Sequence, residues 1–268
     1  MKTGLIGCGK MGRALILGAI DSGTLAAEDV LVCSRTPASM LALAEERKVV
    51  PSTLEEVITT CDAILLCTKP ADIETVLKKF TVHGSTTDKK LIISVAAGVT
   101  NATMENIVSD YARVIRAMPN TPSLVGKGAA AFALGCDATS EDAEFAASLF
   151  SSIGKAVEVP EKLMDPVTGL SGSGPAFVYL FIEALADGAV SCGLPRDKAL
   201  ELASQTVLGA ATMVQETGIH PGELKDMVTS PGGTTIAGVT ALEAANFRSA
   251  AIKAVQAATN RSLELGQS

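Results

Sequence analysis

The fold is decided by the stretch TGLIGCGKMG, residues 3–12, in which a short apolar strand runs into a glycine-rich turn. Residues 7–12 match the pattern GxGxxG, and a helical run follows over residues 13–20. In a dinucleotide-binding unit the first glycine makes the tight turn, the second lets a pyrophosphate approach the backbone, and the third lets the helix pack on the sheet. The phosphates would bind N–H groups at the positive end of the helix dipole. The stretch therefore predicts a dinucleotide site; the alternative is a glycine-rich turn that holds no ligand.

Around this stretch, the first 160 residues alternate short apolar runs with longer helical patterns. The predicted strands are 3–6, 30–33, 63–68, 91–95, 114–117, 129–134 and 156–159. The predicted helices between them are 11–22, 38–46, 54–60, 73–78, 104–109 and 141–153. This alternation predicts an α/β Rossmann domain, a doubly wound and mainly parallel sheet with helices on both faces. We expect the last two strands to be antiparallel additions.

The pattern changes after Pro160, because the rest of the chain shows almost no alternation with the period of a strand. The predicted helices there are 162–170, 175–192, 196–217, 221–228, 235–245 and 247–265. We therefore expect two domains, a dinucleotide-binding domain over residues 1–160 and an all-α domain over residues 161–268.

The composition argues against several classes of protein. The 22 Lys and Arg against 29 Asp and Glu give a formal charge of −7, whereas a nucleic-acid-binding protein usually carries a basic face. Only 3% of the residues are aromatic, so few surfaces are available for stacking bases. The six cysteines include no CxxC pair and there are only two histidines, so we expect free thiols and no metal site.

The sequence also bears on location. No basic region followed by an apolar run opens the chain, so we expect no signal peptide and a cytoplasmic protein. The most apolar stretch, residues 176–194, contains Glu183 and Asp187. Two acidic residues in one apolar stretch predict a buried helix rather than a membrane span.

The end of the second predicted strand bears on the choice of cofactor. An NAD-specific site usually places an acidic residue there for the ribose hydroxyls. This chain carries Ser34, Arg35 and Thr36 instead. The hydroxyls and the guanidinium favour a phosphate, so we predict a preference for NADP; a solvated loop arginine is the alternative.

Two later strand ends should face the same crevice, because ligands collect at the carboxyl ends of parallel strands. Residues 67–70 read CTKP, and residues 96–98 read AAG, where small side chains permit the close approach of a ribose or nicotinamide. Lys69 is either a charge near the cofactor or an ordinary surface lysine.

A second glycine-rich segment, SPGGTT at residues 230–235, precedes a predicted helix. Such a helix start exposes unpaired N–H groups at a positive dipole end and suits a carboxylate. The plainer interpretation is that Thr234 or Thr235 is a helix N-cap.

Together, six segments occur in order along the chain: GCGKMG, CTKP, SVAAGVT, RAMPNTP, GLSGSGPAFVYLFIEALADG and LKDMVTSPGGTTIAGVTALE. This combination resembles the pyrroline-5-carboxylate reductases over essentially the whole chain, and SPGGTT with its flanks is its most specific part. The resemblance implies a Rossmann domain, a helical dimerisation domain, and hydride transfer from NADPH to the C=N carbon of pyrroline-5-carboxylate, which gives L-proline. NADH would be a weaker donor.

The resemblance also implies site residues. The implied cofactor-binding residues are Ile6, Gly7, Cys8, Gly9, Lys10, Met11, Gly12, Ser34, Arg35, Cys67, Thr68, Lys69, Pro70, Ala96, Ala97 and Gly98. The implied substrate-binding residues are Gly232, Gly233, Thr234, Thr235 and Glu161. Glu161 matches a position that touches substrate in some relatives, and a plain acid at a helix start is the alternative. At the position of Met227 some relatives carry Asn near the cofactor, so a polar contact is in doubt there.

The implied chemistry agrees with the scarcity of acid and base residues. A cyclic imine is basic enough to arrive as an electrophilic iminium, so the enzyme needs mainly proximity and alignment. We place Thr235 near the ring nitrogen, as the catalytic residue that orients the nitrogen or relays a proton.

Two other functions are alternatives. A β-hydroxyacid dehydrogenase shares the domain plan but expects a lysine on the helix after its GSG turn, and here no lysine follows residues 172–174 until Lys198. A non-catalytic NADP-binding relative is the second alternative, although the intact glycine-rich segments speak against it.

The helical half is expected to form a homodimer. One predicted helix carries apolar residues on overlapping faces: Leu180, Phe181, Ala184, Leu185 and Ala189. These faces must be buried, either by the helix's own domain or by a second chain. The resemblance favours the second chain, and higher assemblies of dimers are expected as well.

Overall fold

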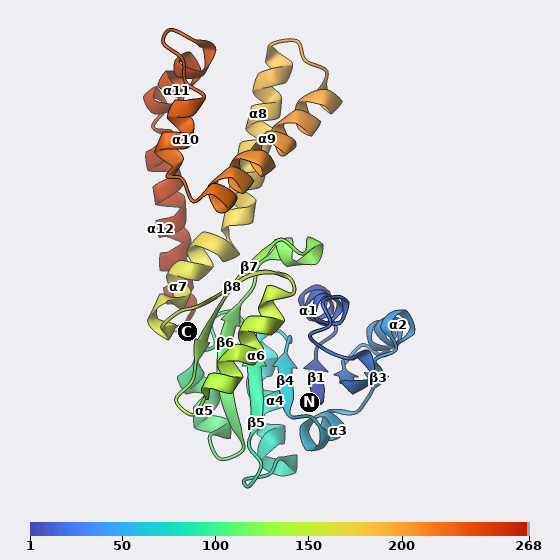
Figure 1. Ribbon diagram of the computed structural model, residues 1–268. Coiled ribbons are helices and arrows are strands. Elements are labelled where there is room, and N and C mark those ends of the chain that lie inside the picture. The colour runs from blue at the N-terminus through green and yellow to red at the C-terminus, as the bar shows by residue number, and fades with distance from the viewer. Residues whose placement is uncertain (267–268) are drawn as a thin grey trace. The chain divides into compact units, whose positions relative to one another are not determined.

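The computed structural model describes residues 1–266. The chain folds into two compact units (Figure 1). The first unit comprises Met1–Ser173 and the chain from Ala257 onward, and the second comprises Gly174–Gln256. Residues 161–173, which the sequence pattern placed with the helical half, thus pack within the first unit.

The first unit is built on one eight-stranded sheet in the order β3-β2-β1-β4-β5-β6-β7-β8. The strands are β1 (Thr3–Ile6), β2 (Val30–Cys33), β3 (Val50–Pro51), β4 (Ala63–Leu66), β5 (Lys90–Ser94), β6 (Ala112–Met118), β7 (Gly128–Leu134) and β8 (Gly154–Glu158). The order reverses between β1 and β4, which creates the crevice where doubly wound sheets bind ligands. Sequence reasoning predicted every strand except the two-residue edge strand β3.

Strands β1 to β6 are parallel throughout. Strand β7 pairs antiparallel with β6, and β8 pairs parallel with β7. Both of the last strands therefore run against the rest of the sheet, as expected, but they are parallel to each other because helix α6 crosses between them.

Alternate residues of the buried strands face two different layers of helices. Leu5 and Leu65 belong to a core with α1 (Lys10–Asp21), α2 (Pro37–Arg47) and α6 (Ser140–Ser151). Their neighbours Ile6 and Leu66 belong to a second core with α3 (Leu54–Thr60), α4 (Pro70–His83) and α5 (Asn101–Val108). Both faces of the sheet are thus covered, as parallel sheets require.

The chain from residue 161 does not form the single helix expected over 162–170. It forms a short 3-10 turn η3 (Glu161–Leu163), helix α7 (Met164–Val167) and a π-helical turn η4 (Thr168–Gly172). The end of α12 (Phe247–Gly266) is bound to this region, since Ser262 Oγ donates to Asp165 Oδ1 at 2.6 Å.

The second unit contains α8 (Gly174–Ser191), α9 (Arg196–Thr217), α10 (Pro221–Met227), α11 (Thr234–Ala244) and the first half of α12. Helices α8 and α9 pack through small side chains, with Ala186, Ala199 and Ala203 buried between them. The rings of Phe181 and Phe247 lie 5.5 Å apart and join α8 to α12. Small alanines allow this close packing of helices.

The expectation of a buried helix over residues 176–194 is wrong for the single chain. Ala186 is the buried residue of α8, while Leu180 is 65% exposed. Within residues 1–266, the helical stretch Glu161–Ser191 passes a length and hydropathy test for a membrane span, with a mean hydropathy of 1.2. Core helices of soluble proteins have the same length and composition.

Helix α6 begins with a buried ionic contact. Thr139 and Asp142 form a reciprocal capping box, and Asp142 also accepts from Arg113 Nε at 2.6 Å and from Arg113 Nη2 at 2.9 Å. Burial acts to raise the pKa of Asp142, but the hydrogen bonds from Arg113 and Thr139 outweigh it, so the pKa is lowered.

Replacing Asp142 by alanine is therefore expected to lower the free energy of unfolding by about 3 kcal/mol, because it leaves the Arg113 charge half-buried and unpaired. Chemical denaturation measures this, with Glu144→Ala on an exposed position of α6 as the control, expected within about 0.5 kcal/mol of the parent.

The pKa shift also gives the sign of the pH dependence. A lowered carboxyl pKa contributes stability above the unfolded value of about 3.9, and this is lost as pH falls through the folded value. The difference between parent and Asp142→Ala should shrink below about pH 4; a difference that stays constant down to that range would contradict the ionic origin.

Candidate functional site

The turn between β1 and α1 is held by contacts to the neighbouring strands. The Gly7 N–H donates to the Cys33 carbonyl at 2.8 Å, and the Cys67 N–H donates to the Ile6 carbonyl at 2.8 Å. Gly7 has a φ of +105°, and a Cβ on it would lie 2.6 Å from the Cys67 carbonyl oxygen. A side chain at this position would therefore be strained and would collide with β4.

The other two glycines of the motif have different surroundings. A Cβ on Gly12 would lie 2.3 Å from the Gly7 carbonyl oxygen, whereas a Cβ on Gly9 would meet nothing within 4 Å. Gly12 is thus required by packing of the fold itself. Gly9 borders open space, so its lack of a side chain serves an approaching ligand rather than the fold.

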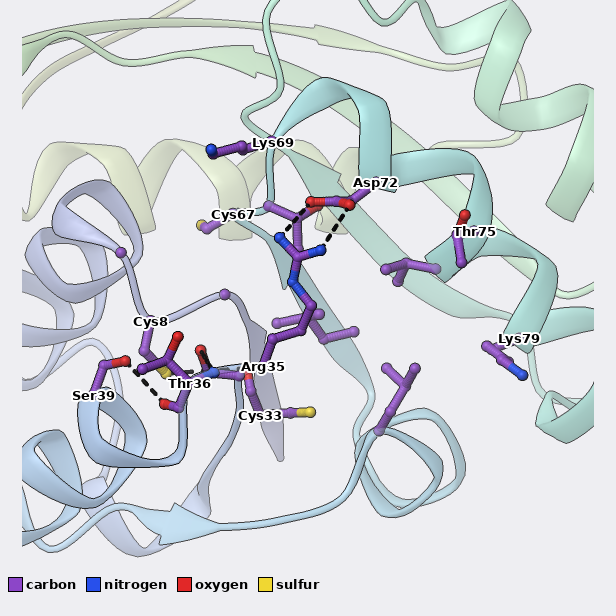
Figure 2. A pocket seen from close by; sticks show the side chains of 17 residues that line it. Cys8, Cys33, Arg35, Thr36, Ser39, Cys67, Lys69, Asp72, Thr75 and Lys79 are labelled. Atoms are coloured by element: carbon purple, nitrogen blue, oxygen red, sulfur yellow. Dashed lines mark hydrogen bonds and ion pairs between the residues drawn. The ribbon is translucent and has the colours of Figure 1, made fainter.

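A cavity of about 470 Å³ lies at the carboxyl ends of β1, β2 and β4 (Figure 2). Nine of the sixteen predicted cofactor residues line it: Ile6, Gly7, Cys8, Gly9, Ser34, Arg35, Cys67, Thr68 and Lys69. Thr36, which sequence reasoning considered beside Arg35, lines it as well. The strand order thus gathers three segments that are about 30 residues apart into one site.

Three cysteines line this cavity, and their thiols are protonated at neutral pH. Burial, with a contribution from Cys33, raises the pKa of Cys8 to about 11, and burial with a contribution from Cys8 raises the pKa of Cys67 to about 12. Burial also raises the pKa of Cys33. These thiols therefore form an apolar lining rather than a set of nucleophiles.

The cavity has the features that a dinucleotide needs. Helix α1 starts at Gly9 without a side-chain cap, so its first N–H groups remain available for an anion. Thr68 lines the cavity, and its buried hydroxyl has no hydrogen-bond partner among residues 1–266. A buried polar atom without a partner is rare and indicates a ligand or a water molecule at that point.

Arg35 extends over the cavity and is paired. Its Nη1 donates to Asp72 Oδ1 at 3.0 Å, and its Nη2 lies 3.0 Å from Asp72 Oδ2. Figure 2 shows the guanidinium facing the Asp72 carboxylate. Sequence reasoning did not single out Asp72, which belongs to the first turn of α4.

A second cavity of the first unit lies at the end of β5. Three further predicted residues, Pro70, Ala97 and Gly98, line it. Its other side is formed by η4 and by the last turns of α12, through Thr168, Ser173, Ala258, Arg261, Ser262 and Leu265. The sequence did not predict the α12 residues, because no local pattern indicates that this helix packs against the end of β5.

The remaining predicted cofactor residues lie near the cavities without lining them. Lys10 is exposed and lines a different cavity beside α1. Met11 packs on the core below the turn, Gly12 contacts Gly7, and Ala96 is buried in the second core. Met11, Gly12 and Ala96 therefore contribute to the packing of the strands and turn that form the site.

The segment SPGGTT forms the start of α11 in the second unit. Gly232 has a φ of +67°, and Gly233 is the N-cap, with no side-chain hydrogen bond to the helix. The expectation that Thr234 or Thr235 caps the helix is therefore wrong, because both already lie within its first turn. The free N–H groups at this helix start are suited to a carboxylate.

Glu161 lies in the first unit, in η3. Its Oε1 accepts from the Asn101 N–H at 2.6 Å and lies 3.5 Å from Arg116 Nη1. Arg116 is buried and also lies 3.9 Å from Asp165 Oδ1. Glu161 therefore ties α5 to β6, in addition to any contact with a ligand.

No group of three His, Cys, Asp or Glu side chains is placed to hold a metal ion anywhere in residues 1–266. All six cysteines are free thiols.

Two family models match separate parts of the chain. Residues 2–98 match "NADP oxidoreductase coenzyme F420-dependent", and residues 161–265 match "Pyrroline-5-carboxylate reductase dimerisation". The first match covers the strands that form the dinucleotide cavity, and the second covers the helical part.

Full-length similarity extends over both parts. A pyrroline-5-carboxylate reductase of Methanosarcina acetivorans is 48% identical over 99% of this chain and 98% of its own length. A solved pyrroline-5-carboxylate reductase of Coxiella burnetii matches with a TM-score of 0.94 and 35% identity over 98% of both chains. A Plasmodium falciparum pyrroline carboxylate reductase, solved with NADP bound, matches with a TM-score of 0.84 and 33% identity over 99% and 98%. From the glycine turn to the SPGGTT helix start, this chain belongs to the pyrroline-5-carboxylate reductase family of NAD(P)-dependent oxidoreductases.

Proposed function

We propose that this protein reduces pyrroline-5-carboxylate to L-proline with NADPH, the last step of proline biosynthesis. The observation that carries the proposal is the full-length match to enzymes of that name, combined with a dinucleotide cavity at the carboxyl ends of β1, β2 and β4. The family result also decides against the hydroxyacid dehydrogenase alternative. The direct test is NADPH oxidation by the purified protein with pyrroline-5-carboxylate, compared with NADP⁺ reduction by the same protein with a β-hydroxyacid; turnover of the hydroxyacid alone would overturn the proposal.

The cofactor site proposed here joins the cavity lined by Arg35 and the cavity at the end of β5. The N-terminus of α1 would hold the pyrophosphate beside Gly7–Gly9, and Thr68 would satisfy its buried hydroxyl on the same ligand. Residues 34 and 35 would meet the adenosine end, and Pro70, Ala97 and Gly98 would leave room for the nicotinamide end. The bound cofactor supplies the hydride, and the protein supplies position and a dry environment.

The substrate site proposed here is the start of α11. The N–H groups that follow Gly233 would hold the ring carboxylate, with Gly232 providing the left-handed turn before the helix. Thr235 would orient the ring nitrogen or pass a proton to it after hydride transfer. We also propose Glu161 as a substrate contact, on the basis of the family resemblance alone.

The assembly proposed here is a homodimer, with further dimers associating into a larger complex. The helices of the second unit expose large apolar side chains, including Leu180 at 65%, Leu202 at 57% and Leu208 at 54%. An apolar surface of this extent is typical of an interface between chains. The family model for dimerisation covers these helices. We further propose a cytoplasmic enzyme without nucleic-acid or membrane partners, on the basis of its charge of −7 and its free thiols.

Two glycine variants separate the fold from the cofactor site. Gly9→Ala should leave thermal stability unchanged, because the new Cβ meets no atom, yet weaken NADPH binding by about tenfold or more, equivalent to about 1.4 kcal/mol. Gly12→Ala should instead lower stability by about 1–3 kcal/mol, because its Cβ collides with the Gly7 carbonyl. Thermal melts and fluorescence titrations with NADPH measure both effects. Unaltered NADPH affinity in Gly9→Ala would remove this turn from the cofactor site.

Thr235→Ala should lower kcat by roughly 10-fold to 100-fold, with little change in NADPH affinity, because it removes the hydroxyl proposed to act at the ring nitrogen. Thr235→Ser, which keeps the hydroxyl, is the matched control and should retain most of the activity. Steady-state kinetics with varied pyrroline-5-carboxylate measure both. Equal kcat for the alanine variant and the parent would remove Thr235 from the mechanism.

The purified protein should have at least twice the mass of one chain by light scattering at micromolar concentration. Leu180→Glu should lower that mass, because it places a charge in the proposed interface. Leu41→Glu, at a 56% exposed position of α2 in the first unit, is the control and should leave the mass unchanged. A parent protein with the mass of a single chain would contradict the dimer.

A further inference from the structure

The carboxylate of Asp72 is paired with the Arg35 guanidinium, the group that the sequence predicts to bind the cofactor phosphate. Both terminal nitrogens of Arg35 are within 3.0 Å of Asp72 oxygens, which is the two-point geometry that Arg also uses for phosphate. The Arg35 side chain is 79% exposed and that of Asp72 is 29% exposed. The pair therefore lies at the mouth of the cavity, where a ligand can reach it.

The fold places the two residues at the same ligand position. Arg35 follows β2, and Asp72 lies three residues beyond Lys69 in the first turn of α4, which follows β4. Strands β2 and β4 flank β1 on its two sides. Lys69 and Lys79 line the same cavity, and among the described residues Asp72 is the one acidic residue of the lining.

The two forms of the cofactor differ at this position by one group. NADPH carries a phosphate on the adenosine ribose, with about two negative charges at neutral pH, where NADH carries a hydroxyl. A phosphate must either displace Asp72 from Arg35 or bind beside its negative charge. A hydroxyl has no charge to repel and can donate a hydrogen bond to a carboxylate.

We propose that Asp72 is a specificity-determining residue that competes with the 2′-phosphate for Arg35 and so reduces the preference for NADPH over NADH. This inference rests on the proposed function, because it takes the cavity lined by Arg35 as the adenosine end of the cofactor site. Two unit charges about 4 Å apart in water interact by an energy worth roughly fivefold in affinity, and the phosphate carries more than one charge. Removal of the Asp72 charge should therefore raise the NADPH preference by about fivefold to tenfold.

The test uses Asp72→Asn, which keeps the shape of the side chain and removes its charge. Calorimetric titration of the purified full chain with NADP⁺ and with NAD⁺ should show about fivefold to tenfold tighter NADP⁺ binding and unchanged or weaker NAD⁺ binding. The gain should largely disappear at about 1 M salt, where the Debye length falls to about 3 Å. Glu74→Gln is the matched control, because it removes one charge from an exposed position of the same helix, paired with Lys78 outside the cavity. It should change neither affinity.

The Arg35→Ala background decides whether the two residues act together. In Arg35→Ala, the further change Asp72→Asn should raise NADP⁺ affinity much less, because no guanidinium remains for which Asp72 and the phosphate could compete. A full gain in that background, an unchanged NADP⁺ affinity in Asp72→Asn, or a loss of NADP⁺ affinity would each overturn the proposal; the last would make Asp72 a positioning residue for Arg35.

Activity assays keep this proposal separate from the function itself. If the parent oxidises neither NADPH nor NADH with pyrroline-5-carboxylate, the proposed function fails, while the titrations still test Asp72. If the parent is active and the ratio of kcat/KM for NADPH and NADH does not rise in Asp72→Asn, the role of Asp72 fails alone.

Discussion

The close backbone approach of the first turn to β4 is the constraint on which the rest of the cofactor site depends. Gly7 lies against the Cys67 carbonyl and Gly12 against the Gly7 carbonyl, at distances that no side chain allows. This contact lets the N-terminus of α1 open directly above the point where the strand order reverses. The cavity and the buried Thr68 hydroxyl lie beside this contact.

The electrostatics of the protein are local rather than global. A formal charge of −7 repels an anionic cofactor and an anionic substrate at long range. The N-caps Gly9 and Gly233 make no side-chain hydrogen bond to their helices, and in the proposed sites the N–H groups of these helix starts would attract the anions at short range. The Arg35 charge is partly neutralised by Asp72, so even the cationic end of the cavity is balanced.

The two units differ in how they bury apolar residues. The first unit covers both faces of its sheet with helices, and its central strands β1, β4 and β5 are fully buried. The second unit buries a few alanines between α8 and α9 and leaves many leucines exposed. A helical layer of this kind needs a second apolar surface, which the proposed homodimer would supply from a second copy of the same chain.

Local sequence patterns predicted all strands but β3, most of the helices, the parallel sheet and the glycine turn, because each depends on local periodicity or on a glycine at a fixed spacing. They also predicted nine of the residues that line the first cavity, since strand ends meet at one edge of a parallel sheet. Only the tertiary structure decided that Asp72 holds Arg35, that Glu161 is bound by Asn101 and Arg116, and that α12 returns to the end of β5. These contacts join residues that are 37 or more positions apart, through side chains whose directions no local pattern specifies, so they exist only once the chain has folded.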